Sequence, residues 1–254
     1  MSRFALKFTR DVKRMKILVP SGRESSIFED KVKRKIKKKI KTKNANVDLF
    51  LWPFAHLKYD FVKSWLRGLI TKVKQKDILI DAFWSEFPDI INYIKYFTWD
   101  FNKFSLISER KLPELFALNQ PSLSPESLFN RFVSEFSSEI SQHRAELEVN
   151  LKDVRRRAHS IMFAKPRTYQ RIDYATFLIA QAKKKIKRFE KRVQKQVKSV
   201  LGTLEPLEIV LAEYVLIPFF IIKTDMDIQI FNPFGKPDNF RTKIFRKVVN
   251  YEHT

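Results

Sequence analysis

Residues 124–166 read SPESLFNRFVSEFSSEISQHRAELEVNLKDVRRRAHSIMFAKP and carry the clearest fold signal in the chain. Ser124 offers a hydroxyl cap, Pro125 suits the first helical position, and Glu126 places an acid in the first turn. Apolar or neutral residues then recur at steps of three and four, which predicts a long helix with one buried stripe. These seam positions are Phe129, Val133, Phe136, Ile140, His143, Leu147, Leu151, Val154, Ala158 and Ile161. The Ala164-Lys165-Pro166 segment predicts the end of this helix.

A second run with the same spacing follows the proline. Its seam positions are Ile172, Ala175, Ile179, Ala182, Ile186, Phe189, Val193, Val197 and Val200. Gly202 then stands where a helix C-terminal glycine is favoured. Two such runs joined by a proline-containing turn predict an antiparallel, coiled-coil-like helical hairpin over 125–201. Each arm of about 35 residues would be roughly 50 Å long at 1.5 Å per residue.

Outside the hairpin, the composition also favours helices. The chain has only 4 glycines in 254 residues, which indicates few tight turns. We therefore predict a mainly α fold with an aromatic-rich helical body, the long helical hairpin and a small C-terminal β-hairpin. The predicted segments are a basic N-terminal extension (1–24), a basic helix plus the aromatic-rich body (25–104), a linker (105–124), the helical hairpin (125–201), and a small β-hairpin element with a basic tail (202–254).

The body begins with a basic helix. Residues 26–29 fit a capping box, and Phe28, Val32, Ile36 and Ile40 follow at four-residue spacing. Nearly every residue between them is Lys or Arg, so the apolar stripe is narrow and the remaining circumference is cationic.

Aromatic residues dominate 47–104, where we expect helices near 56–75 and 86–98 with an apolar segment, 78–83, between them. We interpret these aromatics as core residues, because base stacking would need aromatics on an exposed basic face. Near the C-terminus, residues around Thr224-Asp225-Met226 predict the turn of a β-hairpin, and a short helix is expected after Asp238.

The positive charge of the chain is concentrated in two blocks. The formal net charge is +22, from 50 basic and 28 acidic residues. Residues 1–43 hold 16 basic and 4 acidic side chains, and residues 165–201 hold 12 and 2. Self-repulsion of such blocks opposes compaction unless a polyanion neutralises them, and a nucleic-acid backbone is the usual polyanion.

Catalytic and cofactor signatures are missing from the sequence. There is no cysteine, no glycine-rich phosphate loop and no HExxH motif. The four histidines, His56, His143, His159 and His253, share no metal-ligand spacing. We therefore predict a protein that is not an enzyme and that has no cofactor and no metal site.

Two acidic pairs are candidate magnesium sites. Asp77 and Asp81 could share a helix face, and Asp225 and Asp227 could share a strand face as in polymerases and nucleases. Capping by Asp77 and a turn role for Asp225 are the favoured interpretations.

The favoured function is a structural RNA-binding protein of a large ribonucleoprotein, for which a ribosome, and an organellar one in particular, is the leading hypothesis. Lysine outnumbers arginine in both basic blocks, which favours contact with phosphates over base recognition. The predicted RNA-binding residues are Lys31, Lys33, Arg34, Lys35, Lys37, Lys38, Lys39, Lys41, Arg155, Arg156, Arg157, Lys183, Lys184, Lys185, Lys187, Arg188, Lys191, Arg192, Lys195 and Lys198.

The predicted partners are RNA, with ribosomal RNA favoured, and neighbouring proteins of the same assembly. The apolar run 207–222 carries Glu208, Glu213 and Pro218, so no membrane span is expected. Abundant Phe, Lys, Ile and Asn are typical of A+T-rich coding and suggest a mitochondrial or other organellar matrix, with the cytoplasm as the alternative. Three other functions stay open: a viral or DNA-packaging nucleoprotein, a nucleic-acid enzyme subunit using Asp225 and Asp227, and attachment to anionic lipid.

Overall fold

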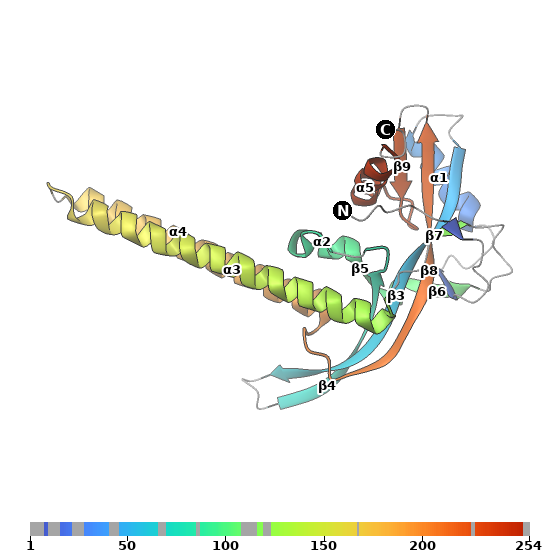
Figure 1. Ribbon diagram of the computed structural model, residues 1–254, viewed down its shortest axis with the longest axis horizontal. Coiled ribbons are helices and arrows are strands. Elements are labelled where there is room, and N and C mark those ends of the chain that lie inside the picture. The colour runs from blue at the N-terminus through green and yellow to red at the C-terminus, as the bar shows by residue number, and fades with distance from the viewer. Residues whose placement is uncertain are drawn as a thin grey trace. The chain divides into compact units, whose positions relative to one another are not determined.

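Two long antiparallel strands, β3 (Asn46–Trp65) and β8 (Glu208–Thr224), form the centre of a mixed β-sheet (Figure 1). The structure is a computed structural model that describes residues 8–9, 16–21, 28–40, 46–65, 70–84, 87–107, 116–118, 123–166, 168–224 and 227–250. It divides into two compact units, here called the sheet unit (1–86, 95–129 and 206–254) and the hairpin unit (87–94 and 130–205).

Within the described residues the sheet has nine strands, and its main path is β1-β7-β3-β8-β2-β6. β4 extends the sheet beside β3 and then pairs with β5, while β9 pairs with β8. The pairs β2–β8 and β3–β7 are parallel, and the others are antiparallel. The other strands are β1 (Phe8–Thr9), β2 (Lys16–Pro20), β4 (Ile70–Asp81), β5 (Thr98–Asp100), β6 (Phe104–Ile107), β7 (Phe116–Leu118) and β9 (Asp227–Phe231).

This sheet contradicts the predicted mainly α fold. Residues 56–75, expected to be helical, contain the second half of β3 and the start of β4. Every residue from 50 to 57 is buried, so this part of β3 is covered on both faces. A strand buried on both faces shows a continuous apolar run instead of alternation, and periodicity cannot distinguish that run from a buried helix.

The C-terminal β-hairpin is part of the same sheet and is not a small separate element. β8 is 17 residues long and pairs with β3, β2 and β9. The predicted turn does join β8 and β9, with Thr224 paired to Asp227. Helix α5 (Asn239–Asn250) follows, and within the range expected to be a basic extension, residues 17–20 are buried in β2.

Shorter helical elements lie between the strands in sequence. α1 (Phe28–Ile40) buries Val32 and Ile36 against β2, β3, β8 and β9. α2 (Ile90–Phe97) leads into β5, and a 3-10 turn, η2 (Phe101–Lys103), links β5 to β6. Of the other predicted helices, the one expected near 86–98 therefore forms as α2.

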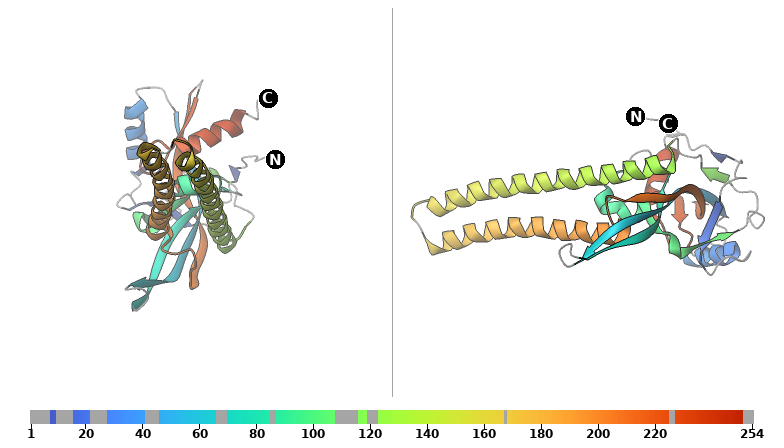
Figure 2. Two further views of the ribbon diagram at one scale, coloured as in Figure 1. Left: turned by 90° about the vertical axis from the view of Figure 1, so that its left-hand side faces the viewer. Right: turned by 90° about the horizontal axis from the view of Figure 1, so that it is seen from below.

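The hairpin unit contains two long antiparallel helices, α3 (Pro125–Phe163) and α4 (Tyr169–Gln196), which lie side by side (Figure 2). The Ser124 hydroxyl accepts a hydrogen bond from Ser127 N at 3.1 Å, as expected of a cap. α4 ends in a π-helical turn, η4 (Val197–Leu201), and Gly202 terminates it with φ of 77°.

The seam of this hairpin follows the sequence pattern. Every predicted seam position is buried or half-buried except Ile172, which is 38% exposed. Across the seam, the rings of His143 and Phe189 stack at 5.9 Å, and Arg144 Nη2 lies 3.8 Å from Glu190 Oε1. Among the described residues, no helix has both the length and the apolar character needed to cross a bilayer.

Candidate nucleic-acid interface

Helix α1 presents its cations on one side because its apolar residues face the other. Val32 and Ile36 are one turn apart and almost fully buried. Lys31, Arg34, Lys35, Lys37 and Lys38 are exposed, whereas Lys33 is half-buried. The side chain of Lys39 and all of Lys41 lie outside the described residues.

The run of cations on α4 and η4 covers the part of the helix surface that is not buried in the seam. All nine predicted residues are exposed: Lys183, Lys184, Lys185, Lys187, Arg188, Lys191, Arg192, Lys195 and Lys198. Ala182, Phe189 and Val193 are buried in the seam, and at 3.6 residues per turn the cations spread over the rest of the circumference. The four of α4 that lie most nearly opposite the seam are Lys184, Lys187, Lys191 and Lys195.

Few acidic groups compensate this α4 face. Glu190 is the one acid among residues 183–198, and it points to Arg144 of α3. Arg192 Nη1 donates to Asn92 Oδ1 at 3.4 Å, and its guanidinium lies 5.7 Å from the centre of the Phe189 ring. Arg192 is therefore tied to its own unit, while Lys183, Lys187 and Lys191 form a row at four-residue spacing.

Arg155, Arg156 and Arg157 are also exposed, but they do not lie beside the α4 run. The contacts of His143 with Phe189 and of Arg144 with Glu190 fix the register of the two helices. In that register Arg155 lies about one and a half turns, roughly 8 Å, beyond Lys183 toward the closed end of the hairpin. Arg156 also pairs with Asp153 at 3.6 Å.

Exposed aromatics near the closed end of the hairpin are a feature that the sequence analysis missed. Phe163, Tyr169, Tyr174 and Phe177 are 55%, 88%, 55% and 55% exposed. None of the four is a predicted seam position, so the sequence pattern already indicated that these rings would be exposed. Solvent-exposed rings beside Arg171 and Lys165 offer stacking surfaces to unpaired bases.

The aromatics of 47–104 are mainly core residues, which confirms their interpretation as core. Phe50, Trp52, Phe54, Tyr59 and Phe97 are all buried. Burial raises the pKa of the Tyr59 hydroxyl well above its usual value. Tyr93 and Tyr96 are exposed, and Trp99 is half-buried.

Of the two acidic pairs, the structure describes the side chains of one, Asp77 and Asp81. Asp77 and Asp81 lie on strand β4 and not on a helix, and they bind His56 and Arg241 respectively. Asp225 lies outside the described residues, as does the side chain of Asp227. Within the part of the chain that the structure describes, no three His, Asp or Glu side chains converge as a metal-binding group.

Arg241 occupies a fully buried site that its sequence context did not suggest. It binds Asp81 and donates to Asp238 Oδ2 at 2.7 Å and to the Tyr96 carbonyl at 3.0 Å. Burial alone would lower the pKa of Arg241, but the charges of Asp81 and Asp238 raise it, so the guanidinium stays charged. Its predicted place in a basic tail does not make it available to RNA.

Aromatic rings enclose the same guanidinium. Its central carbon lies 4.8 Å from the Phe219 ring centre, 5.1 Å from Trp52 and 5.4 Å from Trp99. Burial raises the pKa of Asp81, against the opposing effects of Arg241 and of the Trp52 indole, which donates to it at 2.7 Å.

A second polar network crosses the sheet. His56 Nε2 lies 2.6 Å from Asp77 Oδ1 and its Nδ1 lies 3.2 Å from Glu213 Oε1, while Phe101 stacks on the ring at 3.9 Å. Burial would raise the pKa of Glu213, but hydrogen bonds from Lys16 and His56 outweigh burial and lower it.

Comparison of the chain with protein-family models, with curated proteins and with solved structures gave no match. The candidate interface is therefore defined by the exposed cations of α1 and α4 and by the paired state of the carboxylates described above.

Proposed function

We propose that this chain is a structural RNA-binding protein of a large ribonucleoprotein, with a mitochondrial or other organellar ribosome as the assembly. The observation that supports this most is the basic surface of α4 and η4, where nine exposed cations accompany a single acid that faces α3. An exposed α1 surface of five further cations adds to it.

The proposed mechanism is counterion release. Lysine ammonium groups on α1 and α4 lie along RNA phosphates and displace the cations condensed there, which makes affinity fall steeply with salt. Because flexible lysine stems act as point charges, they hold the RNA backbone in place and do not read base edges. A rigid seam beneath α4 keeps the cations in register, which lowers the entropy cost of binding.

The test is RNA binding by the full chain at several salt concentrations. We expect substitution of Lys183, Lys187 and Lys191 by Gln to weaken binding and to reduce the slope of log K against log[salt] by about 0.7–0.9 for each phosphate that is no longer neutralised. The charge-conserving control replaces the same three residues by Arg and should keep the slope. A wild-type affinity that does not depend on salt would overturn the proposal.

The nature of the assembly needs a separate measurement. We expect the tagged chain to co-sediment with ribosomal RNA in gradients of organelle lysate, and ribonuclease treatment to release it. Equal affinity of the purified chain for duplex DNA and for RNA would instead favour the packaging alternative.

A further inference from the structure

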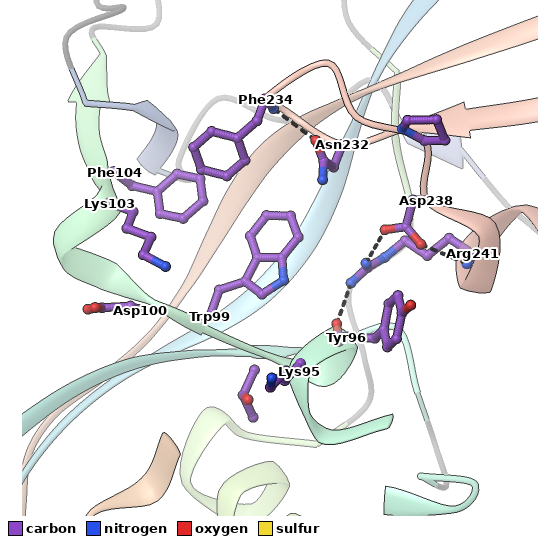
Figure 3. A pocket seen from close by; sticks show the side chains of 12 residues that line it. Lys95, Tyr96, Trp99, Asp100, Lys103, Phe104, Asn232, Phe234, Asp238 and Arg241 are labelled. Atoms are coloured by element: carbon purple, nitrogen blue, oxygen red, sulfur yellow. Dashed lines mark hydrogen bonds and ion pairs between the residues drawn. The ribbon is translucent and has the colours of Figure 1, made fainter. Parts of the chain in front are cut away.

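A pocket of about 500 Å³ opens in the sheet unit between the end of α2, strands β5 and β6, and the turn that follows β9 (Figure 3). This volume lies within the range of small-ligand sites, which combine apolar walls with a few oriented polar groups. The side chains that matter for its chemistry are Lys95, Trp99, Lys103, Phe104, Asn232 and Phe234.

Three aromatic rings from three elements form the apolar wall. The rings of Trp99 and Phe104 are nearly parallel, 5.6 Å apart with 5° between their planes. Phe234 lies 5.7 Å from Phe104 at 60°. Trp99 and Phe234 are only half-buried, so their surfaces are accessible from the pocket. Such a wall suits a flat aromatic ligand, because offset stacking gains energy beyond area burial.

Asn232 supplies an oriented hydrogen-bond donor. Its Oδ1 accepts from Phe234 N at 3.0 Å and from Lys236 N at 3.1 Å. These two bonds fix which end of the amide is oxygen. The amide nitrogen then points toward Trp99 across the pocket (Figure 3), where it can donate to a carbonyl or ring nitrogen.

Two lysines supply positive charge at the same pocket. Lys95 and Lys103 are both exposed, and Lys103 extends toward the Trp99 indole (Figure 3). The acids that line the pocket already accept hydrogen bonds: Asp100 Oδ1 from Asn102, and Asp238 from Arg241. A planar ring, a fixed donor and an ammonium group together match a nucleotide, with its base on the wall and its phosphate at Lys103.

The basic helix α1 adjoins this pocket. Lys35 Nζ donates to the Phe234 carbonyl at 3.3 Å, so α1 touches the turn that carries Asn232 and Phe234. Gly235 in that turn has φ of 70°, and a Cβ there would lie 3.4 Å from Val32 and Lys35. The turn is therefore packed against α1 at Val32 and Lys35, so Lys35 is the α1 cation nearest to the pocket.

We infer that this pocket receives one unstacked nucleobase of an RNA strand whose neighbouring phosphates lie on α1. The inference rests on the proposed function and adds a preference for single-stranded over fully paired RNA at this site. Only an unpaired base can leave its stack and enter a pocket, whereas the phosphates of a duplex can still contact the lysines.

The experiment compares a short single-stranded oligouridylate with a blunt RNA duplex of equal phosphate number, on the full chain. Asn232→Asp keeps the acceptor of the turn but removes the donor, and Asn239→Asp makes the same charge change on an exposed residue outside the pocket. We expect Asn232→Asp to weaken oligouridylate binding about fivefold or more, because the base loses its hydrogen-bond donor and faces a carboxylate instead. Duplex binding should match that of Asn239→Asp.

A second variant, Lys103→Gln, tests the pocket if Asn232→Asp fails to fold. Its control is Lys236→Gln, because Lys236 is exposed and does not line the pocket. If the chain binds RNA and all four variants bind the single strand equally well, the pocket assignment is overturned and the proposed function survives. If the wild type binds neither the oligouridylate nor the duplex, the proposed function and the pocket assignment are both wrong.

Uridine monophosphate tests the source of the nucleotide. It presents the same base and phosphate without a strand, and we expect it to compete only far above the oligouridylate concentration. Competition at equal concentration would overturn the assignment to an RNA strand in favour of a free nucleotide.

Discussion

The sheet unit and the hairpin unit use positive charge in opposite ways. In the sheet unit, Arg241 is fully buried between Asp81 and Asp238 and surrounded by aromatic rings. In the hairpin unit, the α4 cations are exposed and accompanied by one acid. Both belong to basic stretches of sequence, so the number of positive residues in a stretch does not reveal which of them can meet a polyanion. The position of the nearest carboxylates decides it.

The largest effect is expected at the buried cation. Arg241→Met keeps much of the side-chain volume but leaves Asp81 and Asp238 buried without their counter-charge. We expect a loss of about 3–5 kcal/mol in the free energy of unfolding. Urea denaturation measures it, and Lys243→Met, exposed on the same helix, should change stability by less than about 0.5 kcal/mol. Equal stability of both variants would show that Arg241 is not paired as described.

The seam of the hairpin unit comes next. Phe189 is 8% exposed and stacks on His143, so Phe189→Ala should destabilise α3 and α4 by about 3 kcal/mol. Phe177 lies on the same helix but is 55% exposed, and Phe177→Ala should cost less than about 0.5 kcal/mol. Hydrogen exchange of the α3 and α4 amides measures the difference, and protection should fall in Phe189→Ala but not in Phe177→Ala. Similar protection in both variants would contradict the assigned seam.

The smallest effect concerns the ion pair between Lys16 and Glu213. Its exposure lies between that of the buried Arg241 and that of the exposed α4 cations. The pKa of Glu213 is lower in the folded state than in the unfolded state. The ion pair therefore stabilises the fold fully above the unfolded pKa, and this stabilisation is lost as pH falls through the folded pKa. We expect a decrease in stability below about pH 4.5 of under about 1 kcal/mol, because solvent screens the pair.

The control for this acid effect is Glu213→Gln. The variant should be slightly less stable at neutral pH and should show a flatter decline of stability between about pH 5 and pH 3. Identical pH profiles for the variant and the wild type would mean that the interactions of Glu213 with Lys16 and His56 do not stabilise the fold.

Local signals were sufficient for the hairpin unit. The cap at Ser124, the glycine at 202 and the steps of the seam depend on residues close in sequence, and the helices begin and end where those signals place them. The exposure of the α4 cations follows from the same spacing. Exposed aromatics such as Tyr169 could have been found by asking which rings fall off the seam.

Long-range pairing explains why the sheet could not be predicted. β3 pairs with β8, as in Asn46 with Lys223, and no local pattern records a partner so distant in the chain. The pocket has the same origin, since Trp99 and Asn232 come from elements far apart in sequence. His56, Asp77 and Glu213 likewise meet only because three strands bring them together.

The sequence by itself determined the two-helix hairpin and its basic face, because helix periodicity and capping act over a few residues. Tertiary structure alone decided that the body is a sheet, that Arg241 is buried, and that Asn232 faces Trp99. Each of these depends on strand register and on burial, which arise only when segments distant in the chain pack against one another.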